Sequence, residues 1–179
     1  WQQNGQYFVA EADEYVIALV QYRNYFSSSM PNGALVRGYV QLETPANAAI
    51  SQHYPLFNEL IDGTLVDTGY FGVTPPRYLG PIIGATKNKP VRLVFRNLLP
   101  TGAGGDLFLP TDSTLMGAGM GPMAMADPMD EGSVMDMVRN PMCSEYPKPD
   151  SCFSDNRATV HLHGGISPWI SDGTAHQWI

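Results

Sequence analysis

Residues 90–98, PVRLVFRNL, carry the clearest secondary-structure pattern in the chain. Apolar and basic side chains alternate along this stretch, with Val91, Leu93 and Phe95 on one face and Arg92 and Arg96 on the other. Successive side chains of an extended chain point to opposite faces, so this alternation predicts a β-strand with one wet side.

Two segments nearer the N-terminus also favour strands. Residues 34–43 alternate in the same way, with Val36, Val40 and Leu42 on one face, and follow a Pro-Asn-Gly turn at 31–33. Residues 15–22 are apolar on both faces, which fits a strand covered on both sides or a short buried helix. With 18 glycines and 15 prolines punctuating the chain, we expect an all-β fold of short strands joined by turns.

Length and charge narrow the function classes. A chain of 179 residues suits one domain, which we place across residues 1–179. The formal net charge of −7 would repel a phosphate backbone, so nucleic acid is not an expected partner. No apolar run approaches the roughly 20 residues of a membrane helix, so no membrane span is expected.

Residues 158–163 bring two histidines together. Alternation predicts a strand that directs Val160 and Leu162 to the core and His161 and His163 to the other face. Two parallel imidazoles at this spacing can reach two neighbouring metal ions, although the spacing alone does not choose the metal. The alternative is that both are half-exposed strand residues without a ligand.

The surrounding residues resemble the multicopper oxidases. The run HLHGG at 161–165, followed by PWISDG at 168–173 and HQWI at 176–179, closely resembles the first copper-binding segment of that family. Upstream, GYFG at 69–72, GPII at 80–83 and the strand ending in Asn97-Leu98 look like the family's opening pattern. The resemblance covers 68–99 and 158–179, and the long insertion between them resembles that of some bacterial members.

This resemblance implies a fold and a set of copper ligands. The fold would be a cupredoxin-like Greek-key β-sandwich, incomplete at its C-terminus, with a Gly/Met/Pro-rich insertion at about 101–157. His161 would bind the type 2 copper and His163 a type 3 copper of a trinuclear cluster. Gly164 would let the backbone turn away from the cluster. Asp172, in the Asp-Gly loop, would relay protons as dioxygen is reduced; its alternative is a simple Asp-Gly turn.

The chain supplies only part of such a site. The family's trinuclear cluster uses four HxH-type pairs, whereas this chain has one. The family's type 1 copper uses a cysteine with a neighbouring histidine, and neither cysteine of this chain has one. The resemblance therefore implies an exported, periplasmic or secreted oxidase whose remaining cupredoxin domains lie in the same polypeptide or a companion chain. Dioxygen and a phenolic or low-valent metal substrate would be its other partners, and this chain alone should be inactive.

The remaining cysteines, histidines and methionines have plainer interpretations. Cys143 and Cys152 lie close together in a Pro- and Ser-rich stretch, which favours a disulfide over half a zinc site. His53 is expected to be structural and His176 an ordinary loop histidine. Eight of the nine methionines lie between residues 116 and 142, where packing is favoured over Cu(I) recruitment. A non-catalytic cupredoxin-like domain, metal-binding or purely structural and extracellular, remains the alternative function.

Overall fold

The computed structural model describes two compact units of the chain, Trp1–Leu99 and Pro100–Ile179. The residues that it describes are 12–113, 119, 143, 147–149, 152–158 and 160–168, with the backbone alone at 2–3 and 6–7. Within these residues the regular structure is β-strand apart from two short 3-10 helices and the single 3-10 residue Cys143, which confirms the all-β prediction. The single domain with an insertion stays a prediction.

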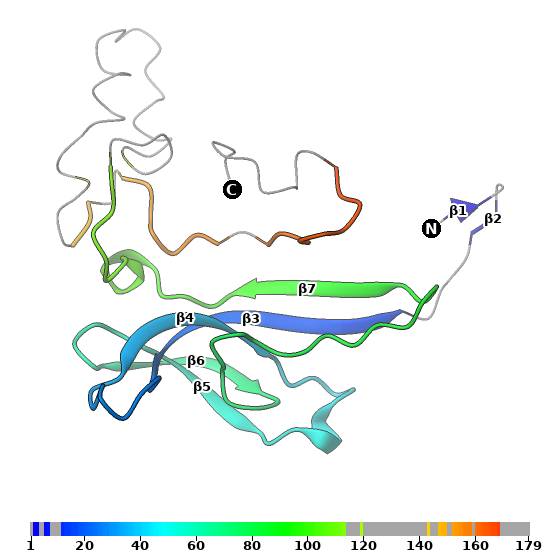
Figure 1. Ribbon diagram of the computed structural model, residues 1–179, viewed down its shortest axis with the longest axis horizontal. Helices are drawn as coiled ribbons and strands as arrows, with labels where there is room; N and C mark the ends of the chain where they lie inside the picture. The colour runs from blue at the N-terminus through cyan, green and yellow to red at the C-terminus, as the bar shows by residue number, and fades with distance from the viewer. Residues whose placement is uncertain are drawn as a thin grey trace, which may run out of the picture. The chain divides into compact units, whose positions relative to one another are not determined.

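A three-stranded sheet forms the centre of the first unit (Figure 1). β3 (Asp13–Asn24) lies in the middle and pairs antiparallel with β4 (Ala34–Gln41). On its other side, β3 pairs in parallel with β7 (Val91–Asn97). These are the three strands that the hydrophobic patterns predict, so their existence is confirmed.

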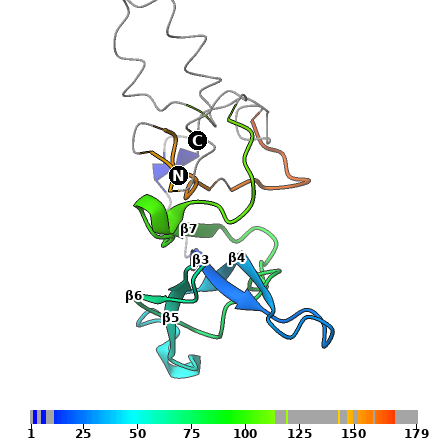
Figure 2. The same cartoon turned by 90° about the vertical axis from the view of Figure 1, so that its left-hand side faces the viewer.

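A two-stranded hairpin lies beside this sheet. β5 (Tyr54–Glu59) pairs antiparallel with β6 (Leu65–Gly72), with a register irregularity between Pro55 and Phe57. An isolated bridge between Leu42 and Gly72 joins β6 to the chain leaving β4. Figures 1 and 2 show the hairpin next to β3 and β4. The alternation pattern predicts neither strand of the hairpin.

The other elements are short. β1 (Gln2–Gln3) and β2 (Gln6–Tyr7) form a small antiparallel pair near the N-terminus. The 3-10 helices are η1 (Ala48–Ile50) in the first unit and η2 (Gly102–Gly105) in the second. In the part of the chain that the structure describes, no helix has the length and apolar character needed to cross a membrane.

Both faces of β3 are buried, which explains its uninterrupted apolar sequence. One face contributes to a core cluster shared with β4, the chain after it and β5, made of Ala18, Val20, Val40, Leu42 and Leu56. On the opposite face, Ile17 and Leu19 are only 4% and 5% exposed. For residues 15–22 the sequence allowed either a strand or a buried helix. The pairing of β3 with both β4 and β7 shows that these residues form a strand.

The two faces of β7 differ from the expectation that the arginine face would be exposed to solvent and the apolar face buried. The register places Arg96 beside Ala18, so the arginine face of β7 lies on the same side of the sheet as the core cluster. There the guanidinium of Arg96 lies over the ring of Tyr70, 5.8 Å from its centroid. The apolar face is not fully covered, because Val91 and Leu93 remain 38% and 39% exposed.

The strand predicted for residues 158–163 is wrong for the residues that the structure describes there. Residues 160–162 have no regular structure, and His163 and Gly164 lie in a turn. Val160 and Leu162, expected in the core, are 51% and 68% exposed. Alternation alone does not make a strand: the described residues provide no partner strand for this backbone and no burial for its apolar side chains.

Candidate metal-binding site

His161 and His163 lie side by side although no strand carries them. Their ring centroids are 5.6 Å apart, and the ring planes are inclined by 43°. Both residues are exposed, so a metal ion could reach the rings without displacing a packed core. The structure therefore brings the two predicted ligands together, but on an irregular, solvent-facing segment.

The turn after the pair requires a glycine. Gly164 adopts φ +79°, a left-handed conformation that strains any residue with a Cβ. A Cβ built at this position would meet nothing within 4 Å, so backbone conformation rather than crowding selects the glycine. The sharp turn expected at Gly164 is confirmed.

The pair fits part of a copper donor set. Neutral imidazole nitrogen is a good ligand for copper, and two adjacent exposed rings can serve one ion or two neighbouring ions. Among the described residues, no group of three or more His, Cys, Asp or Glu side chains is placed to hold a metal. A site of higher coordination number would need ligands beyond those that these residues provide.

Two of the residues singled out from the sequence lie outside the described residues. These are Asp172, the expected proton relay, and His176, the expected loop histidine. The same is true of the Met-rich run, for which the choice between packing and Cu(I) recruitment stays a prediction.

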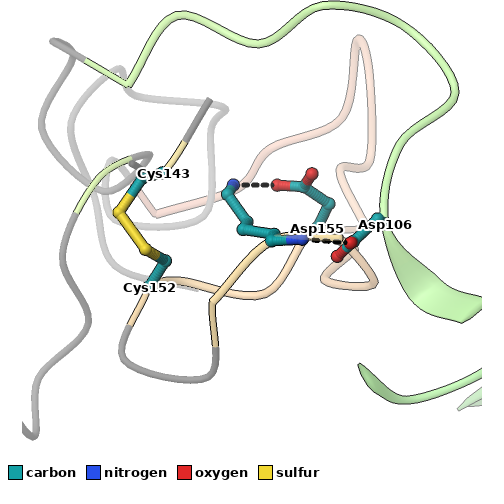
Figure 3. Close-up of a disulfide and its surroundings, with 5 residues drawn as sticks. Asp106, Cys143, Cys152 and Asp155 are labelled. Carbon is teal, nitrogen blue, oxygen red and sulfur yellow. Dashed lines mark hydrogen bonds and ion pairs between the residues drawn. A yellow bond between two sulfur atoms is a disulfide. The ribbon is translucent and has the colours of Figure 1, made fainter. Parts of the chain in front are cut away.

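The predicted disulfide is confirmed. Cys143 and Cys152 are joined by an S–S bond of 2.03 Å, and the two residues are 1% and 8% exposed. Figure 3 shows this bond beside two carboxylates, Asp106 and Asp155. The bond closes a short loop in the second unit, a few residues before the histidine pair.

An ion pair lies within the same part of the second unit. The Nζ of Lys148 lies 2.6 Å from Oδ1 of Asp155, and the two side chains are only 4% and 11% exposed. The backbone N–H of Lys148 donates to Oδ2 of Asp106 at 2.7 Å (Figure 3). Burying an ammonium group is costly unless it is paired, so this lysine is held in one place by its partners. The sequence offers no signal for this pairing.

His53 makes several side-chain and backbone contacts that its sequence context does not predict. Its Nδ1 lies 3.1 Å from Oε1 of Glu43, and its ring stacks on Phe71 with centroids 3.9 Å apart. Its backbone adopts φ +51°, and its N–H donates to Oγ of Ser51 at 2.9 Å. These contacts tie the connection between β4 and β5 to β6, which supports the expected structural role. The positive φ could not be predicted from the sequence, because few residues other than glycine adopt it, even though histidine does so more often than most.

The carboxylate of Glu43 is stabilised in its charged form by the same contacts. The hydroxyl of Ser51 donates to it and lowers its pKa, and the neighbouring His53 lowers the pKa further. The side chain of His53 is 64% exposed, so the pair contributes to the position of the connection more than to stability.

Comparison with known proteins identifies no relative. No family model, curated protein or solved structure matches the chain. The likeness to the multicopper oxidases therefore rests on the residues of 68–99 and 158–179, and the function that it implies is a proposal.

Proposed function

We propose that this chain is the N-terminal part of a multicopper oxidase and contributes ligands to its trinuclear copper cluster. The observation that carries the proposal is the pair of exposed imidazoles of His161 and His163, 5.6 Å apart within the HLHGG run. Their nitrogens are chemically suited to copper, and Gly164 provides the turn that directs the backbone away from them.

Each residue has a distinct role in this proposal. His161 binds the type 2 copper, and His163 binds one of the type 3 coppers. When bound, copper supplies the electron transfer that reduces dioxygen to water. Asp172 would hold and release a proton as dioxygen is reduced, and a carboxylate hydrogen-bonded to ligand imidazoles would also orient them.

The rest of the oxidase supplies what this chain lacks. The other HxH pairs and the type 1 copper site belong to further cupredoxin domains, in the same polypeptide or a companion chain. Reducing equivalents come from one-electron oxidation of a phenolic compound or a low-valent metal ion. The chain alone is therefore inactive as an oxidase.

The finer fold belongs to the same proposal. The all-β architecture and the half-exposed apolar face of β7 are compatible with a cupredoxin-like Greek-key sandwich whose second sheet is incomplete. The disulfide between Cys143 and Cys152 supports a periplasmic or secreted location, because such bonds persist in oxidising compartments.

Copper analysis of the complete oxidase tests the proposal. We expect copper in the preparation and oxygen consumption with a phenolic substrate. The double variant His161→Ala/His163→Ala should lose copper from the cluster and lose activity. His53→Ala, a histidine held away from the pair by Glu43 and Phe71, should keep both. A complete assembly without copper by elemental analysis would overturn the assignment.

A non-catalytic copper-binding domain is the second candidate. It requires only the two imidazoles that the structure brings together, those of His161 and His163 with ring centroids 5.6 Å apart. Oxygen consumption separates the two candidates: this second function predicts copper bound through His161 and His163 with no turnover of a reducing substrate in any assembly.

A further inference from the structure

The outer edge of β4 is only partly paired by the chain that follows β6. Isolated bridges join Leu42 to Gly72 and Tyr39 to Arg77. Residues 73–76 therefore lie opposite only two residues of β4, so this stretch bulges away from the strand. Two of its residues are prolines, which have no N–H to donate to a ladder.

The bulge leaves one backbone donor of β4 unpaired. The N–H of Leu42 donates to the carbonyl of Val16 at 2.8 Å, so the backbone groups of the preceding residue, Gln41, point away from β3. The carbonyl of Gln41 accepts from the N–H of Val73 at 2.8 Å, but the carbonyl of Val73 accepts from the N–H of Gln52 at 2.8 Å. In the described part of the chain, nothing accepts from the N–H of Gln41. Backbone donors normally have a partner, so a ligand oxygen is a suitable one.

A pocket of about 270 Å³ lies at this bulge. Gln41 and Arg77 are among its polar lining residues, and its apolar lining includes Pro75, Pro81 and Ile82. None of the residues that line it is acidic. Its volume is near the lower end of small-molecule sites, roughly 300–1,000 Å³, which limits a ligand to a compact body.

Arg77 carries a positive charge that no described residue neutralises. It is exposed, and within the described residues its side chain makes no hydrogen bond, ion pair or ring contact. Two other exposed or half-exposed arginines are paired, Arg23 with Glu59 and Arg92 with Glu14. An unpaired guanidinium in an acid-free lining favours an anion, and the chain as a whole has a net charge of −7, so the local excess of donors is not a general property of its surface.

We propose that this pocket binds a small organic carboxylate whose apolar body is about the size of one ring. A carboxylate can accept two parallel hydrogen bonds from the guanidinium of Arg77. Its oxygens can also accept from a backbone N–H, which is the group that Gln41 leaves unpaired. The proline rings and Ile82 offer the apolar wall on which the body of the ligand packs.

Titration calorimetry of the full chain with benzoate tests the charge and the body of the ligand separately. Benzyl alcohol has the same ring without the charge, and acetate has the carboxylate without the ring. We expect benzoate to bind at least about tenfold more tightly than either, because each of the other two probes lacks one of the two kinds of contact.

Two arginine variants locate the site. Arg77→Gln should weaken benzoate binding at least about tenfold, because it removes a charge-assisted donor. Arg92→Gln, at an exposed arginine outside the pocket, is the matched control and should bind as the unaltered chain does. Arg77→Lys keeps the charge but loses the planar fork, so its affinity should be intermediate. The amide proton signal of Gln41 should move to lower field when benzoate binds, since its N–H gains an acceptor.

Several results would overturn this inference. Benzyl alcohol or acetate binding as tightly as benzoate would exclude an organic carboxylate as the ligand class. Equal losses in Arg77→Gln and Arg92→Gln would indicate general attraction of anions to the surface. The inference goes beyond the proposed function and does not depend on copper, so His161→Ala/His163→Ala should leave benzoate binding unchanged. A loss in that variant would place the ligand outside this pocket.

Discussion

The side-chain oxygen of Asn58 accepts a hydrogen bond from the backbone N–H of Gln21 at 2.8 Å. The parallel ladder between β3 and β7 ends with the bond from the N–H of Leu98 to the carbonyl of Leu19. The next ladder bond would join the N–H of Gln21 to the carbonyl of Leu98. Instead, Nδ2 of Asn58 donates to that carbonyl at 2.7 Å. One buried amide from β5 thus satisfies both groups where β7 leaves the sheet.

Removing this amide should destabilise the first unit. Asn58 is 2% exposed, so Asn58→Ala leaves a buried donor and a buried acceptor without partners, at about 1–3 kcal/mol each. Asn58→Asp should not restore stability, because it places a buried carboxylate beside the carbonyl oxygen of Leu98 in place of a donor. Denaturant unfolding measures both, with exposed Asn32→Ala as the control. Equal stability of Asn58→Ala and the control would contradict this account.

Tyr22→Phe should leave stability unchanged or raise it by about 1 kcal/mol. The hydroxyl of Tyr22 is buried and has no hydrogen-bond partner among the described residues, and burial raises its pKa. Deleting the hydroxyl removes a desolvated polar atom without breaking a contact. The midpoint of thermal unfolding measures this effect, and Tyr25→Phe, at an exposed tyrosine, is the control variant. A clear loss of stability in Tyr22→Phe would reveal a partner for the hydroxyl.

Acid should weaken the contact between Glu43 and His53. The folded pKa of Glu43 lies below its ordinary value of 4.5, so its contribution to stability is present above 4.5 and is lost as pH falls through the folded pKa. Glu43→Gln should therefore show a smaller fall in unfolding free energy than the unaltered chain between pH about 6 and about 3. Parallel curves for the two proteins would exclude this contribution.

Gly164→Ala should disturb the histidine pair without unfolding the protein. The left-handed φ of Gly164 costs about 1 kcal/mol or more for a residue with a Cβ. Asparagine tolerates this conformation better than other residues, so Gly164→Asn is the matched control. We expect Cu²⁺ affinity to fall in Gly164→Ala and to stay closer to the original in Gly164→Asn. The same affinity in both variants would show that the turn does not position the rings.

The strands with regular alternation or a long apolar run could be predicted from the sequence. β3, β4 and β7 follow from local patterns because their side chains face consistent environments. β5 and β6 do not, since Pro55 interrupts the first, a register irregularity follows it, and side chains on both faces of β6 are exposed. Which strands pair could not be predicted either, because contacts such as that between Gln21 and Asn58 depend on distant segments.

The candidate site could be predicted only in part. The sequence places His161 and His163 together and marks Gly164 as a turn, and both features are present. The strand expected beneath them is not, because alternation at Val160 and Leu162 cannot guarantee a neighbouring strand. The burial of Lys148 against Asp155 depends on contacts with the distant residues Asp106 and Leu107, which local sequence does not encode.

The partly uncovered apolar side of β7 has a practical consequence for handling the isolated chain. In the residues that the structure describes, β7 is an edge strand paired with β3, and its Val91 and Leu93 are 38% and 39% exposed. Such edges recruit strands from neighbouring molecules. Concentrated solutions of this chain should therefore self-associate, and the charges of Arg92 and Arg96 are the local features that oppose aggregation there.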